Sequence, residues 1–343
     1  MKQRSLAPLI AITLGLVAGA CGTTAADDGA GRAAASTAGP LPSSAGCADV
    51  ETSSGPVSLT DSFGRKVELE QPAQRVAVLE WQQVEDVLTL CTTPVAVADT
   101  KGYALWNGAE QLPEGVADVG GRREPNLDAL YATNPDLVII EAYTAGDEII
   151  KTLEGRGVPV LATKGADTED PVQNMLDTFE LIGAALGREA RATAVVDEFE
   201  RHLEDAKREV ENVEAREFVY FDGYITGGNV SLRPFGQGSL VGELGEALGM
   251  TNAWTGEVDE AYGLGQTDIE GMTAVGSASF FYTGTVDPES DDVMAELEKN
   301  PIWSSLPAVE EKRTHAFPAG IWTFGGPRSA QQIVDAYVDL LTS

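Results

Sequence analysis

The sequence predicts an α/β protein of two lobes joined by one long helix, with a ligand cleft between the lobes. The first observation is a repeated unit, residues 126–140 and 268–282. Each copy opens with an N-cap residue, has an acid two positions later where the helix dipole favours it, and runs through a short amphipathic helix into an apolar strand. The second observation is that the longest helical pattern, residues 188–213, lies between the two copies. Small ligands commonly bind in clefts between such lobes.

The chain begins with a pattern typical of secretion, residues 1–20. Lys2 and Arg4 precede an apolar stretch that ends in small residues before Cys21. This pattern predicts a signal peptide, because the stretch is shorter than the ~20 residues that a membrane-spanning helix needs. A cysteine directly after the cleavage site resembles the bacterial lipobox, whose cysteine is acylated. We expect a lipid on Cys21, a flexible tether over residues 21–55, and a location on the outer face of the cytoplasmic membrane.

Residues 56–187 are predicted to form the N-terminal lobe. A hairpin is expected over Val57–Leu69 with its turn at residues 61–64. The pattern then alternates between strand and helix, which indicates a mostly parallel sheet flanked by helices. Strands are expected at 75–79, 94–98, the end of the first repeat and 158–161, and helices at 82–90, the start of that repeat, 147–154 and 171–186. The last of these helices should end at Gly187, a favoured residue after a helix.

Residues 188–213 are the predicted linking helix, and residues 214–343 form the predicted C-terminal lobe. The linking helix is heavily charged with a narrow apolar stripe, so it should act as a rigid spine. In the lobe that follows, strands are expected at 217–221, the end of the second repeat and 313–317. Helices are expected at 240–248, the start of that repeat, 290–298 and 329–342.

Composition excludes several function classes. The formal net charge of −31 repels nucleic acid and attracts cationic ligands only weakly and from a distance. Two histidines are too few for a zinc- or manganese-capture protein, and neither a phosphate-binding loop nor a Gly-x-Ser-x-Gly elbow occurs. We expect no enzyme activity, no cofactor and no protein-held metal. Cys47 and Cys91 either form a disulfide or remain one buried and one exposed thiol.

Candidate ligand-binding residues lie in predicted loops. Arg122 and Arg123 follow Asp118-Val-Gly-Gly121 at the carboxyl edge of the sheet, where they are either surface residues or hydrogen-bond donors to an oxygen-rich ligand. Aromatic residues are expected in loops at positions 81, 103, 106, 143, 224, 254, 262, 322 and 324. Such residues suit a bulky, partly apolar ligand rich in oxygen, although Trp254 and Trp303 are the first candidates for core positions.

At these residues the chain resembles the ferric-hydroxamate siderophore-binding proteins of ABC importers, a class of substrate-binding protein with a helical backbone. Matching stretches occur in order over most of residues 60–330. They are residues 75–81, 97–99 with 103–106, 118–122 with 124–127, 235–236 with 239–240, 252–254 with 256–257, and 301–303 through 324–325. The resemblance implies two lobes on one long helix with little hinge motion, and capture of an iron-loaded siderophore for a membrane permease.

The resemblance also implies roles for particular residues. In the family an Arg and a Tyr contact the hydroxamate oxygens around iron, and Arg122 falls on the Arg position while Tyr143 lies one residue from the Tyr position. Aromatic lining positions coincide with Trp106, Trp322 and Phe324, and Tyr262 lies near another. One acid on each lobe docks onto arginines of the permease, and these positions match Asp128 and Glu270. Iron is thus expected only within the siderophore, and the protein is expected to be a monomer.

Other interpretations remain open at this point. The cargo could instead be a ferric catecholate, haem or a corrinoid, although a hydroxamate suits a chain with few clustered basic residues. A cationic side arm on the ligand would fit the acidic surface. Alternatively, the chain could be a hydrolase using Glu141 with Glu257 or Asp259, or a structural lipoprotein that binds no small molecule.

Overall fold

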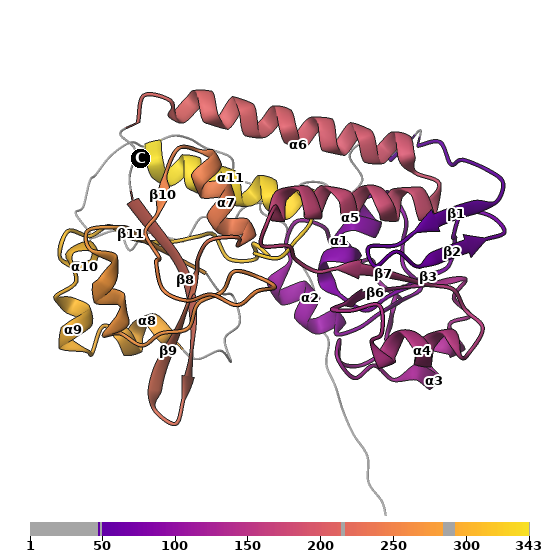
Figure 1. The fold of residues 1–343 in the computed structure, drawn as a ribbon, viewed down its shortest axis with the longest axis horizontal. Helices are drawn as coiled ribbons and strands as arrows, with labels where there is room; N and C mark the ends of the chain where they lie inside the picture. Colours follow the sequence, from indigo (N-terminus) through magenta and orange to yellow (C-terminus); the bar gives the residue numbers. More distant parts are fainter. Residues whose placement is uncertain (1–46, 49, 214–216, 284–291, 343) are drawn as a thin grey trace, which may run out of the picture. The chain divides into compact units, whose positions relative to one another are not determined.

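The computed structural model describes residues 47–48, 50–213, 217–283 and 292–342 (Figure 1). The predicted signal peptide, Cys21 and most of the predicted tether lie outside these residues. Within them, no helix combines the length and the apolar character that crossing a membrane requires.

The first sheet is entirely parallel and has the strand order β5-β4-β3-β6-β7. Because its strands are covered by helices, they consist almost wholly of buried apolar residues. The strands are β3 (Val76–Val78), β4 (Ala96–Val97), β5 (Ala117–Asp118), β6 (Leu137–Ala142) and β7 (Val160–Lys164). The helices between them are α1 (Trp81–Thr89), α2 (Thr100–Trp106), α3 (Leu127–Ala132) and α4 (Glu148–Glu154). Of these helices, α2 was not predicted, and its residues were expected to form a loop.

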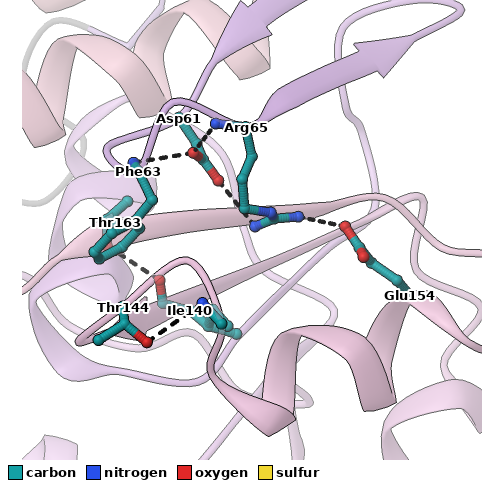
Figure 2. Close-up of polar contacts among 8 residues, drawn as sticks. Asp61, Phe63, Arg65, Ile140, Thr144, Glu154 and Thr163 are labelled. Carbon is teal, nitrogen blue, oxygen red and sulfur yellow. Dashed lines mark hydrogen bonds and ion pairs between the residues drawn. The ribbon is translucent and has the colours of Figure 1, made fainter.

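The predicted hairpin is present as β1 (Val57–Thr60) and β2 (Lys66–Leu69), paired antiparallel. Asp61 shapes its turn by accepting hydrogen bonds from the backbone N–H groups of Phe63 at 3.0 Å and Arg65 at 2.9 Å. Figure 2 shows the Arg65 side chain lying between Asp61 and Glu154 of α4 and forming an ion pair with each. The hairpin is therefore held against the parallel sheet by charge as well as by packing.

The segment before the hairpin is also held in place. Cys47 and Cys91 form a disulfide, which is the first of the two alternatives that the sequence left open. The backbone N–H of Ser53 donates to the carbonyl of Gly187 at 2.9 Å. Covalent and hydrogen bonds therefore fix the last residues of the predicted tether to the first lobe.

The second sheet has the parallel order β10-β8-β11-β12, with β9 added antiparallel to β8. Its strands are β8 (Glu217–Thr226), β9 (Asn229–Phe235), β10 (Thr251–Asn252), β11 (Ser279–Tyr282) and β12 (Thr314–Ala316). Strand β9 was not predicted. Gly227 and Gly228, both with positive φ, form the two-residue turn that joins it to β8.

The second copy of the repeated unit differs from the first in its helix. Asn126 accepts a hydrogen bond from Ala129 N–H at 3.0 Å and Asp268 accepts one from Gly271 N–H at 2.9 Å, so both copies begin with a hydrogen bond between a side chain and the N–H three residues later. The first then forms α3, whereas the second forms the 3₁₀ helix η1 (Gly271–Val275) before β11.

The long helix α6 (Glu189–Val210) follows α5 (Pro171–Leu186) and packs along both α5 and the last helix, α11 (Pro327–Thr342) (Figure 1). Its buried stripe includes Val195 and Phe199, as the pattern predicted. The remaining helices of the second half are α7 (Leu240–Ala247), α8 (Val293–Leu297), α9 (Pro301–Ser304) and α10 (Pro307–Glu310). The predicted architecture of two α/β lobes joined by a long helix is thus the observed one.

Candidate ligand-binding cleft

A cavity of about 480 Å³ lies where loops from the two lobes meet. This volume is within the range typical of small-molecule sites. In the first lobe, Glu80 follows β3, Gly165 follows β7, and Glu141 lies near the carboxyl end of β6. The second lobe contributes the loop 259–264, Arg233 of β9 and the segment before α11. Parallel sheets place their ligands at this carboxyl edge.

Five of the six predicted ligand-binding residues line this cavity: Arg122, Tyr143, Tyr262, Trp322 and Phe324. The sixth, Trp106, is not among the residues that line this cavity. It is the last residue of α2, and this helix directs the indole onto the apolar core of the first lobe. Trp254 and Trp303 are buried in the core of the second lobe, as expected.

Arg122 is held by charge and by aromatic rings. Its guanidinium forms an ion pair with Glu80, whose carboxylate also caps α1 by accepting from Trp81 N–H at 2.8 Å. The guanidinium carbon lies 3.8 Å from the ring centroid of Trp81 and 5.8 Å from that of Trp322. Cation–π attraction of this kind fixes the side chain while leaving its outer N–H groups available to a ligand.

An aromatic wall from the second lobe faces this arginine. Trp322 and Phe324 have ring centroids 5.2 Å apart, and those of Phe324 and Tyr262 are 5.5 Å apart with nearly perpendicular planes. Phe235 supports Phe324 from behind at 5.6 Å. Edge-to-face contacts of this type make the wall rigid and apolar.

Glu141 and Tyr262 form a hydrogen bond that joins the two lobes. The tyrosine hydroxyl donates to Oε1 of Glu141. Burial raises the pKa of Glu141, with a further contribution from the nearby negative charge of Glu80, while the hydrogen bond from Tyr262 opposes the shift. Burial and the charge of Glu141 in turn raise the pKa of Tyr262. From the sequence, Glu141 was considered only as a catalytic carboxylate of a hydrolase.

Two further arginines, Arg123 and Arg233, line the cavity. The sequence alone did not show whether they reach it. Arg123 donates to the Tyr143 hydroxyl at 3.3 Å. Arg233 donates to Asp222 across the β8–β9 hairpin, at 2.9 Å from its Nε. Arg328 does not line the cavity and forms an ion pair with Glu198 on α6 instead.

Asp128 and Glu270, the acids of the repeated unit, are both exposed. The Asp128 side chain retains 92% of its accessible surface, and its ion pair with Arg156 is long, at 3.7 Å. Each carboxylate is therefore available to a partner.

The family profile described as periplasmic binding protein matches residues 76–319, well over half of the chain. The chain belongs to this family. The Iron(3+)-hydroxamate-binding protein FhuD of Escherichia coli K12 is 28% identical over 262 residues, which cover 76% of this chain and 84% of FhuD. The Fe(3+)-citrate-binding protein YfmC of Bacillus subtilis is 27% identical over 259 residues, 75% of this chain and 78% of YfmC. The family resemblance inferred from sequence motifs is confirmed.

Solved structures share the fold. The Fe3+–Desferal-bound siderophore-binding protein FhuD of Vibrio cholerae superposes with a TM-score of 0.67 at 23% identity, covering 79% of this chain and 98% of that chain. Among the described residues, no group of three or more His, Cys, Asp or Glu side chains could hold a metal ion.

Proposed function

We propose that this protein binds a ferric siderophore of the hydroxamate type and delivers it to the permease of an ABC importer. The observation that carries the proposal is the cavity between the lobes, where Arg122 is held against Trp81 and faces an apolar aromatic wall. A ferric trishydroxamate presents oxygens around a nearly neutral centre. One guanidinium can hydrogen-bond to those oxygens while the rings contact the linker carbons. The name of the Escherichia coli relative, an iron-hydroxamate-binding protein, supports the same assignment.

The charges of the cavity favour a hydroxamate over a catecholate. A ferric catecholate complex carries several negative charges and requires an excess of cations. Here Arg122 is paired with Glu80 and Arg233 with Asp222, and Glu141 and Asp259 add further negative charge to the lining. The cavity therefore has no cationic excess to offer.

The carboxylates of the cavity support binding rather than hydrolysis. Asp259 accepts hydrogen bonds from the backbone N–H groups of Ala261, Tyr262 and Leu264 at 2.8–2.9 Å, so it organises its own loop. Glu141 is bonded to Tyr262, and Glu257 is exposed and does not line the cavity. These contacts do not favour a pair of carboxylates that act as catalytic acid and base.

The test is a titration of the full chain, followed by intrinsic tryptophan fluorescence, with ferrioxamine B, ferrichrome and a ferric catecholate. Trp322 lines the cavity, so a bound iron complex should quench its emission. We expect saturable quenching by a hydroxamate and affinity reduced roughly 10- to 100-fold in Arg122→Ala, the usual range for losing a charged hydrogen bond. Arg208→Ala, at an exposed position on α6, serves as the control. Quenching by the catecholate alone would overturn the cargo assignment.

We further propose that Cys21 anchors the chain to the membrane and that Asp128 and Glu270 contact arginines of the permease. The acids lie at the starts of α3 and η1, one on each lobe, and both are exposed. In cells that depend on this protein for siderophore uptake, Asp128→Arg combined with Glu270→Arg should abolish uptake without changing affinity in vitro. Cys21→Ser should release the protein from the membrane fraction. Normal uptake by the double variant would exclude the docking role.

A further inference from the structure

The cavity contains charged groups of both signs, and most of them are already engaged. Among the described residues that line it, Arg122 is paired with Glu80 and Arg233 with Asp222 on the neighbouring strand. The Asp259 carboxylate is occupied by backbone N–H groups. Arg123 and Glu141, which attract each other by charge, have neither an ion pair nor a set of backbone hydrogen bonds within the described part of the chain.

Glu141 is the more constrained of these two. Its Oε1 accepts the hydrogen bond from Tyr262, whereas Oε2 has no hydrogen-bond partner among the described residues. The carboxylate lies directly against Gly165: a Cβ at that glycine would be 2.4 Å from Cδ of Glu141, 2.5 Å from Oε2 and 2.7 Å from the Tyr262 hydroxyl. The absence of a side chain at residue 165 thus gives the carboxylate its position in the cavity wall.

Oε2 of Glu141 is a hydrogen-bond acceptor, and the part of the proposed cargo nearest to iron has no donor for it. Hydroxamate oxygens that surround iron are themselves acceptors, so they match Arg122 and Arg123 but repel a carboxylate. A donor for Glu141 must therefore come from a part of the cargo outside the iron's oxygen shell. A primary ammonium satisfies both the hydrogen bond and the charge of a largely buried carboxylate.

We propose that Glu141, positioned by Tyr262 and Gly165, forms a subsite for a primary ammonium group carried by the cargo, so that the cleft prefers a cationic hydroxamate siderophore. The inference rests on the proposed function and adds the charge class of the substrate. Arg122 contacts the iron-bound oxygens, and Glu141 binds the ammonium of the side arm. The overall negative charge of the protein acts in the same direction but does not place the ammonium at a particular residue.

The test compares ferrioxamine B with its N-acetylated derivative, which keeps the same iron-hydroxamate core and lacks the ammonium. For the full chain we expect ferrioxamine B to bind roughly 10- to 100-fold more tightly, the range that a hydrogen bond between charged groups usually contributes. In Glu141→Gln the two ligands should bind with equal affinity. Glu209→Gln removes the same charge from an exposed site on α6 and should keep the preference.

Tyr262→Phe provides a second variant, which leaves the carboxylate in place and removes only its hydroxyl partner. The preference for the ammonium should persist in this variant, because Glu141 still lacks a cation. Equal affinity of the two ligands for the unmodified chain would overturn the inference, as would an equal loss for both ligands in Glu141→Gln. Failure of the unmodified chain to bind either ligand would instead contradict the proposed function.

Discussion

Gly165 shows how a single missing side chain can shape the cleft. The atoms that a Cβ at this position would meet are the ends of the Glu141 and Tyr262 side chains, which can rotate away, and the backbone φ of Gly165 is not in the left-handed region. We therefore expect Gly165→Ala to change the free energy of unfolding by less than ~1 kcal/mol, as for other compatible Gly→Ala substitutions. Displacement of the Glu141–Tyr262 pair should nevertheless weaken hydroxamate binding about tenfold.

Thermal unfolding and fluorescence titration of the same variant separate these two effects. Gly146→Ala is a suitable control, because a Cβ there would make only an ordinary 3.8 Å contact with Thr144. Unchanged affinity in Gly165→Ala would mean that the pair does not contribute to the binding surface.

Residues of the cleft differ in how well the sequence predicted them. Arg122, Trp322 and Phe324 were predicted because their local motifs match a family pattern, and the structure places all three on the cavity. Glu80 was not predicted, because its role depends on an ion pair with a residue 42 positions away. An acid between a buried strand and a helix does not by itself identify such an ion pair.

At the scale of elements, periodicity predicted helices and parallel strands well and failed where a turn decides the structure. Strand β9 lies beside β8 because Gly227 and Gly228 adopt positive φ, a conformation that glycine allows at little cost. A Gly-Gly pair between two runs of strand-forming residues is a signal for such a hairpin, and Pro234 in the second run weakens that signal. The consequence is functional, since β9 carries Arg233 into the cavity.

The same applies to α2, where a local capping contact outweighs a weak pattern. Asp99 accepts a hydrogen bond from Gly102 N–H at 3.0 Å and begins a helix of seven residues. The helix buries Tyr103 completely and turns Trp106 toward the core. Trp106, which was expected to line the cleft, therefore packs against the core of the first lobe.

At the scale of the whole molecule, the lobes are joined by buried acids behind the cleft as well as by α6. Glu85 on α1 accepts hydrogen bonds from Asn107 at 2.7 Å and from the backbone N–H of Ser329 at 2.8 Å, which ties the first lobe to the start of α11. Asp86 beside it is fully buried, and neither of its carboxylate oxygens has a partner in the described structure. Glu110 is also buried and accepts from Thr89 at 3.2 Å.

These acids make the stability of the protein depend on pH in a defined direction. Burial raises the pKa of Glu110 to about 7, and burial also raises the pKa values of Glu85 and Asp86, the latter with a contribution from the charge of Glu85. Each folded-state pKa is above its unfolded value, so the native state holds protons that the unfolded chain releases. The contribution of these three acids to stability should therefore be greatest at acidic pH and should fall as pH rises toward and through 7.

Glu110→Gln isolates one part of this effect. For a pKa raised from 4.5 to about 7, the loss between pH 5 and pH 8 amounts to about 3 kcal/mol at most, and the variant should remove that contribution. Glu209→Gln changes the net charge equally at an exposed site and should leave the slope of melting temperature against pH unchanged. A melting temperature that rises between pH 5 and pH 8 would contradict the assignment. The hydrogen bonds by which Glu85 connects α1 to α11 favour its ionised form and oppose part of the pKa shift that burial causes.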